Sequence, residues 1–204
     1  MKRLPRFAVL VLLAAWPAGV CAGTIDTGFI QQTWPRQIVR YIEAGKHEVR
    51  WRQRTSKRDG VFAGVRFEAL RDRETVWKRA TDYHDIGANT PGVTAVRFLE
   101  ITPDRQVLEV DVKVLWKTLR LTFEVEREPP TQLRFRVTNS VIGEYRGVCM
   151  FESASEARTA VELSTWLKPA RPIPLRLIVM IERMTFLRGA EHFLDSLEQQ
   201  PLAA

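Results

Sequence analysis

The sequence contains very little cysteine and histidine, and this scarcity excludes several classes of chemistry at once. It has two cysteines, Cys21 and Cys149, and three histidines, His47, His84 and His192. No HExxH, CxxC or similar ligand spacing occurs, and neither a GxSxG motif nor a glycine-rich phosphate loop is present. We therefore predict no metal site and no cofactor, and assign no catalytic residues. A binding protein is favoured over an enzyme.

The positive charge of the sequence is concentrated at its N-terminus. The formal net charge is +7, and three cations lie within the first six residues. The apolar run Phe7–Ala15 follows, and small residues end at Ala22. A basic start, a short apolar run and a small-residue cleavage site are typical of a secretory signal peptide. We predict that residues 1–22 form such a peptide, cleaved after Ala22, and that the protein is periplasmic or secreted.

Two other interpretations of this leader stay open. It could remain as an uncleaved N-terminal anchor, or Cys21 could be lipidated, although Ala18-Gly19-Val20 is a poor match to the motif that lipidation requires. If the leader is removed, Cys149 has no partner for an intramolecular disulfide. We expect Cys149 to pack as a small hydrophobic side chain rather than to act as a reactive thiol.

The charge that remains after residue 22 is mild. Without the leader, 28 Lys and Arg residues face 24 Asp and Glu residues, a net charge of +4 over 182 residues. This charge is too diffuse to predict nucleic-acid binding, and no basic stripe with interleaved aromatic residues is present. It permits transient contact with an anionic membrane surface.

Hydrophobic periodicity predicts strands first, then a short helical region, then more strands and a long helix. Residues 23–46 are expected to be an N-terminal extension, either a leader or an extra strand. The alternating segments His47–Arg54 and Val61–Leu70 predict strands, and helical spacing predicts short helices at Arg73–Ala80 and Ile86–Asn89. Six further strands are expected: Val93–Ile101, Val107–Trp116, Leu119–Val125, Leu133–Val137, Tyr145–Glu152 and Thr159–Leu167. A final helix is predicted at Leu175–Gln199.

The strand pattern alternates with a period of two, so each strand should have one dry face and one wet face. The dry face of a sheet must be covered by another element, and only the C-terminal helix is long enough to cover it. Because twisted antiparallel sheets curl, this helix should lie in the concavity of the sheet. Gly189, within the helix, could mark its close approach to the sheet.

Several short motifs resemble the START-like (SRPBCC) superfamily, in its polyketide cyclase/dehydrase and coenzyme Q-binding branches. The motifs are Thr75-Val76-Trp77, Thr81-Asp82-Tyr83, Pro91-Gly92-Val93, Glu128-Pro129-Pro130 and the strand that contains Gly147. The resemblance implies an α+β helix-grip domain over residues 47–200. In this fold a curved antiparallel sheet surrounds a long C-terminal helix, with two short helices after the first strand. It also implies an internal cavity for lipids, quinones, sterols or polyketides.

Eight side chains are candidates for lining such a cavity, because they lie on the dry strand faces or on the final helix. They are Trp116, Phe123, Phe135, Tyr145, Met180, Glu182, Met184 and Phe186. Methionine suits adaptable apolar surfaces, and an inward Glu182 could hold the polar head of a ligand. The alternative is that the apolar members are ordinary core residues and that Glu182 lies on the solvated side of the helix.

The sequence favours non-catalytic binding or transport of a hydrophobic small molecule, such as a lipid or quinone. One alternative is a cyclase/dehydrase-like enzyme that acts on a hydrophobic substrate, with Glu182, Tyr145 and His84 as candidate titratable groups. Another is a structural or interaction module with a filled core and no ligand. The apolar segment Ile173–Ile181 could form a lid that touches a membrane during ligand exchange, or it could be buried beneath loops.

Overall fold

The computed structural model describes residues 24–32, 38–44, 46–83, 87, 92–114, 117–139 and 142–199, and every structural statement below concerns these residues. The expected signal peptide, His84, Trp116 and, apart from Gly87, the expected second short helix lie outside them. In chain order the elements are α1 (Gly28–Gln32), β1 (Ile38–Ala44), β2 (His47–Ser56), β3 (Gly60–Ala69), α2 (Arg73–Ala80), β4 (Val93–Ile101), β5 (Arg105–Val114), β6 (Lys117–Glu128), β7 (Gln132–Val137), β8 (Gly143–Ser155), β9 (Arg158–Pro169) and α4 (Leu175–Gln199).

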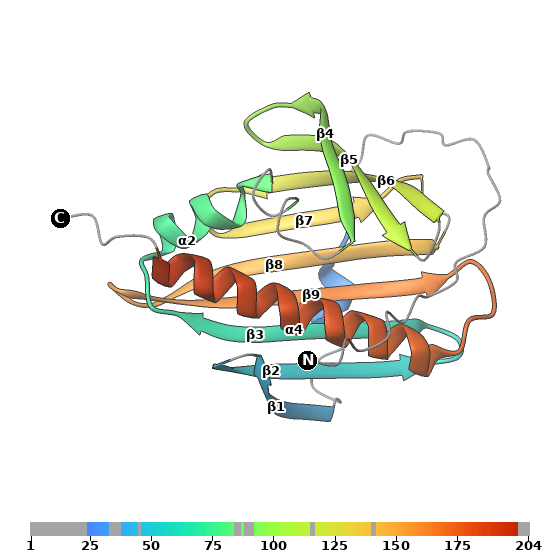
Figure 1. Cartoon of the computed structure of the whole chain (residues 1–204), viewed down its shortest axis with the longest axis horizontal. Helices are drawn as coiled ribbons and strands as arrows, with labels where there is room; N and C mark the ends of the chain where they lie inside the picture. The colour runs from blue at the N-terminus through green and yellow to red at the C-terminus, as the bar shows by residue number, and fades with distance from the viewer. Residues whose placement is uncertain are drawn as a thin grey trace, which may run out of the picture.

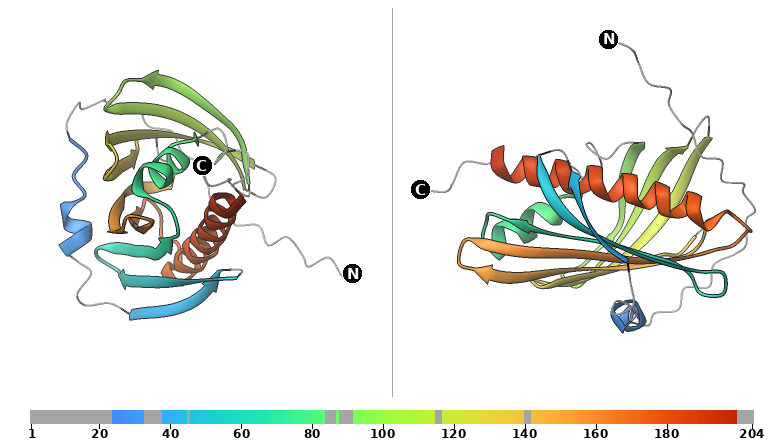
Figure 2. Two further views of the ribbon diagram at one scale, coloured as in Figure 1. Left: turned by 90° about the vertical axis from the view of Figure 1, so that its left-hand side faces the viewer. Right: turned by 90° about the horizontal axis from the view of Figure 1, so that it is seen from below.

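The strands form one antiparallel sheet of nine strands, in the order β1-β2-β3-β9-β8-β7-β6-β5-β4. The sheet curves, and α4 lies across its concave side (Figures 1 and 2). The predicted helix-grip fold is therefore confirmed. One detail differs, because three strands precede α2, whereas the periodicity predicted two and the resemblance implied one. The extra strand β1 comes from the expected N-terminal extension and pairs with β2.

A side chain caps the N-terminal end of the helix α2. The Asp72 carboxylate accepts hydrogen bonds from the backbone N–H and the hydroxyl of Thr75, at 2.9 and 2.6 Å. These bonds, the hydroxyl bond above all, lower the pKa of Asp72, as expected for an N-cap carboxylate. Between its ends the helix buries Trp77, whose ring lies 5.4 Å from that of Phe151 on β8.

The helix α4 covers one half of the concave face. It packs against β1, β2, β3 and α2. On this side the Phe186 ring lies 5.9 Å from Trp51 on β2, and the Phe193 ring lies 5.9 Å from Phe67 on β3. Ring pairs at this distance add to the burial energy of the core. Among the described helices, none is both long enough and apolar enough to cross a membrane.

On the convex face, three carboxylates are each held between two arginines from other strands. The pairs are Asp111 with Arg97 and Arg120 (2.7 and 2.8 Å), Glu124 with Arg105 and Arg136 (3.0 and 2.6 Å), and Glu162 with Arg52 and Arg66 (2.9 and 3.0 Å). The three acidic residues are only 6%, 3% and 8% exposed. The expectation that this face is simply open to water is therefore wrong at these positions.

The convex face also carries a small apolar cluster beneath α1, which lies on the outside of the sheet (Figure 2). Phe29 and Ile30 of α1 pack against Phe62 and Trp166, which come from β3 and β9. The guanidinium of Arg146 lies 5.8 Å from the centre of the Trp166 ring. The segment before β1 therefore covers apolar side chains that would otherwise face water on the outer side of the sheet.

Two glycines differ sharply in their surroundings. A Cβ added at Gly147 on β8 would lie 2.2 Å from the ring of Phe135, so the ring packs directly on the glycine. A Cβ at Gly189 on α4 would meet nothing within 4 Å. The expectation that Gly189 marks a close approach of helix and sheet is therefore wrong, and Gly147 occupies the position where close approach matters.

The first prediction compares the same substitution at these two glycines. We expect Gly147→Ala to lower the free energy of unfolding by about 1–3 kcal/mol, because the Phe135 ring must move. Gly189→Ala should raise it by up to about 1 kcal/mol, because alanine is the better helix former. Urea denaturation of both variants measures the difference. A loss of stability of equal size in both would contradict the packing argument.

Candidate functional site

Three aromatic side chains lie next to one another on the concave face, beside the half that α4 covers. The Phe123 and Phe135 ring centres are 6.2 Å apart, and those of Phe135 and Tyr145 are 5.9 Å apart. We call this group the interior aromatic surface. All three residues pack against the core yet stay only partly buried, unlike Phe186 under α4. Part of the surface of each of these residues therefore remains accessible to solvent.

Glu182 of α4 points into the protein at the border of this surface. It is 7% exposed and shares the buried side of the helix with Val179 and Phe186. The Thr165 hydroxyl on β9 donates a hydrogen bond to its Oε1 at 3.4 Å. Its Oε2 has no hydrogen-bond partner among the described residues. A buried carboxyl oxygen without a partner is rare, and it marks a position where a further group could bind.

Burial sets the protonation of this region. Loss of solvation raises the pKa of Glu182 to about 8, although the Thr165 hydrogen bond opposes the shift. Burial also raises the pKa of Tyr145, and the nearby charge of Glu182 raises it further. At neutral pH most Glu182 side chains are therefore protonated, and the Tyr145 hydroxyl keeps its proton.

A second polar pair lies near α2. The Arg127 guanidinium of β6 is 5.7 Å from the centre of the Trp77 ring, and its Nε is buried. The Tyr83 hydroxyl is also buried, and neither atom has a hydrogen-bond partner within the part of the chain that the structure describes. Burial raises the pKa of Tyr83 to about 12, against the opposing effect of the Arg127 charge. This pair could donate to an acceptor group.

Cys149, on the inner face of β8, lies between these two polar groups in the sheet. It is paired with Leu163 of β9 on one side and with Leu133 of β7 on the other. Burial, and then the charge of Glu162, raise the pKa of its thiol to about 12. A thiol with this pKa is almost entirely protonated at neutral pH, which supports a packing role.

The structure brings together four of the eight residues predicted to line a cavity, namely Phe123, Phe135, Tyr145 and Glu182. Phe186 is also internal, but it belongs to the packed half of the interior. Met180 and Met184 lie on the opposite side of α4, where each is 47% exposed, so they do not join the interior group. Trp116 lies outside the described residues.

The sequence interpretation missed two polar residues of this interior, Thr165 and Arg127. Each lies two residues after an apolar residue that faces inward, so the period-two pattern of its strand places it on the inner face as well. Thr165 follows Val161 and Leu163 on β9, and Arg127 follows Phe123 and Val125 on β6. A polar residue within a run of dry-face positions was the signal that could have identified them.

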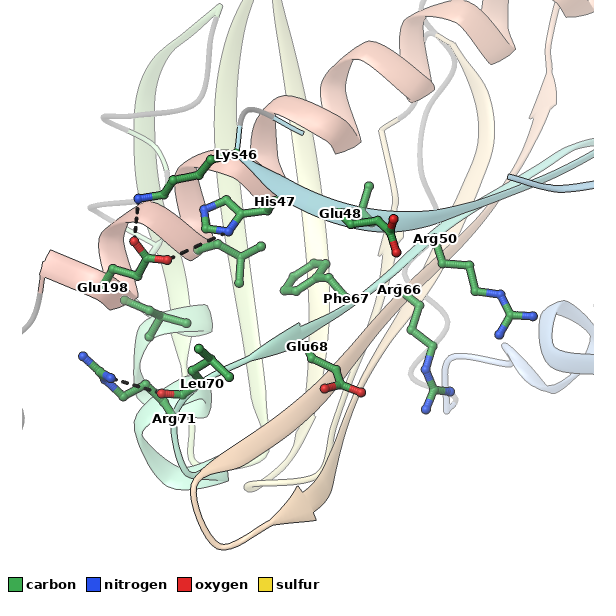
Figure 3. Close-up of a pocket in the computed structure, with 13 residues that line it drawn as sticks. Lys46, His47, Glu48, Arg50, Arg66, Phe67, Glu68, Leu70, Arg71 and Glu198 are labelled. Atoms are coloured by element: carbon green, nitrogen blue, oxygen red, sulfur yellow. Dashed lines mark hydrogen bonds and ion pairs between the residues drawn. The ribbon is translucent and has the colours of Figure 1, made fainter. Parts of the chain in front are cut away.

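A separate groove of about 730 Å³ lies beside the C-terminal part of α4, between this helix and β2 and β3 (Figure 3). Most of its lining side chains are polar or charged: Lys46, His47, Glu48, Arg50, Arg66, Glu68, Arg71 and Glu198. None of the seven predicted lining residues that the structure describes borders it. We therefore do not assign an apolar ligand to this groove.

One set of side chains at the rim of the groove has the composition of a metal site. Ligand atoms of His47, Asp195 and Glu198 lie within 4.8 Å of one another. However, the Lys46 amine already contacts Glu198 at 2.5 Å and Asp195 at 3.4 Å, and His47 bonds to Asp195 at 3.1 Å. These contacts explain the group as an ion-pair cluster that ties the β1–β2 turn to the end of α4 (Figure 3). We call it the Lys46 cluster.

The second prediction concerns the Lys46 cluster and pH. The hydrogen bond from His47, and then Lys46, lower the pKa of Asp195 in the folded protein. A lowered carboxyl pKa stabilises the fold above the pKa of the unfolded state, and this contribution is lost as the pH falls through the folded value. Asp195→Asn should therefore shift the urea midpoint downward at neutral pH, and the shift should shrink in strong acid.

The matched control is Glu191→Gln on the same helix, because Glu191 has no ion pair among the residues that the structure describes. This control should leave the midpoint nearly unchanged at both pH values. A shift for Asp195→Asn that stays constant across the acid range would contradict the assigned role of its charge.

A comparison with protein families matches residues 71–194 to the family model described as polyketide cyclase / dehydrase and lipid transport. No curated protein matches the chain.

Solved structures share the fold. A STAR-related lipid transfer protein from Xanthomonas axonopodis is 14% identical, with a TM-score of 0.64 over 79% of this chain and 99% of that one. Human STARD10 is 11% identical, with a TM-score of 0.66 over 85% of this chain and 78% of that one. The Zhui aromatase/cyclase from Streptomyces sp. R1128 is 15% identical, with a TM-score of 0.55 over 67% of this chain and 90% of that one.

Proposed function

The chain belongs to the polyketide cyclase/dehydrase and lipid transport family, and on this premise we propose that it binds or transports a hydrophobic small molecule without chemical change. The observation that carries the proposal is the interior aromatic surface. Its three rings face inward yet remain partly accessible, because α4 packs on the other half of the sheet. Apolar surface that stays accessible inside a fold favours binding of an apolar guest.

A specific observation favours a second candidate, a cyclase/dehydrase-like enzyme. Glu182 has a pKa of about 8, close to physiological pH, and such a group could donate a proton to a bound substrate. The binding function is preferred because the other titratable groups of this interior, Tyr83, Tyr145 and Cys149, also have raised pKa values. They are protonated at neutral pH, so none of them supplies a base. A cyclase/dehydrase-like enzyme would release a chemically altered substrate, whereas a carrier would release the bound molecule unchanged.

We also propose that the protein is exported through residues 1–22 and meets membranes through the outer side of α4. Met180 and Met184 are exposed there. Between Leu175 and Arg188 the helix carries several arginines, and its one acidic residue is the buried Glu182. Exposed apolar side chains among uncompensated cations suit an anionic lipid surface.

The third prediction tests ligand binding. Chain lacking residues 1–22 should take up the lipophilic fluorophore N-phenyl-1-naphthylamine, and organic extracts of protein purified from cells should contain an unmodified lipophilic molecule. Phe123→Ser should weaken uptake of the fluorophore by roughly tenfold, because it removes about 1–2 kcal/mol of apolar contact. Met180→Ser is the matched control on the outer side of α4, and it should bind like the parent protein.

Circular dichroism of both variants separates loss of binding from loss of folding. The binding proposal would be wrong if the folded parent protein takes up no lipophilic probe, or if both substitutions have the same effect. Recovery of a chemically altered substrate would favour the cyclase/dehydrase-like enzyme instead.

The fourth prediction tests the membrane surface by sedimentation with lipid vesicles. The protein should sediment with anionic phosphatidylglycerol vesicles and much less with neutral phosphatidylcholine vesicles, and added salt should release it. Replacing Arg176 and Arg188 together by glutamine should abolish most of this binding. The control replaces Lys78 and Arg158 by glutamine, which removes the same charge elsewhere. Equal loss in both double variants would show that only net charge matters and would overturn the assignment to α4.

A further inference from the structure

We infer that Glu182, Thr165 and Tyr145 form a head-group site that selects a ligand with an uncharged oxygen, in particular a carbonyl oxygen. The inference rests on the proposed binding function and names the class of ligand. Glu182 is 7% exposed, and its Oε2 has no partner among the described residues. The site borders the interior aromatic surface, because Tyr145 belongs to both. An apolar tail on the rings would therefore bring its polar end to the carboxyl.

The position of Glu182 in the helix gives no structural reason for a carboxyl group. The buried residues around it on α4 are apolar, namely Ile178, Val179 and Phe186. Leucine or methionine would satisfy the packing at this position without placing a polar atom inside. A buried polar atom is normally hydrogen-bonded, and among the described residues only Oε1 has a bond, a long one of 3.4 Å. The free oxygen is therefore available to an incoming group.

The surroundings of Glu182 favour its uncharged form. Thr165 on β9 and Tyr145 on β8 are the polar groups that interact with it, and neither carries a positive charge. No ion pair joins Glu182 to a cation within the described residues. An ionised carboxylate at this position would be buried without compensation, which is strongly unfavourable. The protonated form is the one that the protein supports at neutral pH.

In this form the site presents two hydroxyl groups that keep their protons, on Glu182 and on Tyr145. The Tyr145 hydroxyl also shares a hydrogen bond with the Thr165 side chain. Thr165 is already engaged, because its hydroxyl is 3.3 Å from the Ala63 carbonyl oxygen and 3.4 Å from Glu182. A ketone, ester or quinone oxygen has two lone pairs and can accept from both donors. A carboxylate head would lose its hydration at a site where no described cation pairs with Glu182, and an ammonium head would require Glu182 to ionise.

The fifth prediction uses four probes with the same alkyl chain: a methyl ketone, a carboxylic acid, an amine and the plain alkane. Each competes with a bound lipophilic fluorophore. The parent protein at about pH 6 should bind the ketone roughly tenfold more tightly than the acid or the amine. Its affinity for the ketone should fall at about pH 9, when Glu182 has lost its proton. Alkane affinity should not change with pH.

Two substitutions assign the effect to Glu182. Glu182→Leu should remove the preference for the ketone and leave alkane binding unchanged. Glu182→Gln keeps a donor that cannot ionise, so it should retain ketone binding and lose the dependence on pH. Because glutamine is similar in shape to glutamate, this variant also covers the case in which the leucine variant does not fold.

The outcomes separate this inference from the function on which it rests. If no probe binds, including the alkane, the binding function itself is wrong. If the alkane binds but Glu182→Leu leaves the preference for the ketone unchanged, the function stands and the head-group site is wrong. A preference for the amine that depends on Glu182 would also overturn the inference, because the carboxyl group would then act as an anion.

Discussion

The packing of α4 on only one half of the concave face is the constraint on which the rest of the interior depends. Contacts such as Phe186 with Trp51 fix the helix against β1, β2 and β3. The ion pairs of the Lys46 cluster hold its C-terminal end to the β1–β2 turn. Because the helix packs on this side, Phe123 and Phe135, which lie farther from it than Tyr145, stay only partly buried. A helix centred on the sheet would fill the same space with its own side chains.

The convex face supports this arrangement by joining strands through charged side chains. Each buried carboxylate there is shared by two arginines, as Glu162 is by Arg52 of β2 and Arg66 of β3. Such a pair of bonds links strands across the sheet without using any volume of the concave side. A buried charge that loses one partner is costly, so the geometry of these contacts is tightly constrained. The sheet can therefore keep its curvature while part of its inner face stays open.

Much of this fold was predictable, because alternation and helical spacing are local signals. The strands from Val93 onward, the helix after Asp72 and the long C-terminal helix follow from the sequence pattern. The lateral position of α4 does not, since it depends on which apolar side chains meet across long distances. For this reason Met180 was predicted to face inward, although it lies outside. Glu182 was a candidate for the interior because it interrupts an apolar helix, with the solvated side as the alternative, and the structure buries it.

Glu182 also shows how stability and binding compete at one position. Its carboxyl group is buried among apolar neighbours and, within the described part of the chain, has one long hydrogen bond, so the protein without a ligand carries an unfavourable interaction there. A ligand oxygen that accepts the proton of Glu182 would remove this unfavourable term, and the relief would appear as part of the binding free energy. An apolar residue would make the empty fold more stable and would remove this source of selectivity. A carboxyl group at this position is thus best explained by the bound state, in which its free oxygen has a partner.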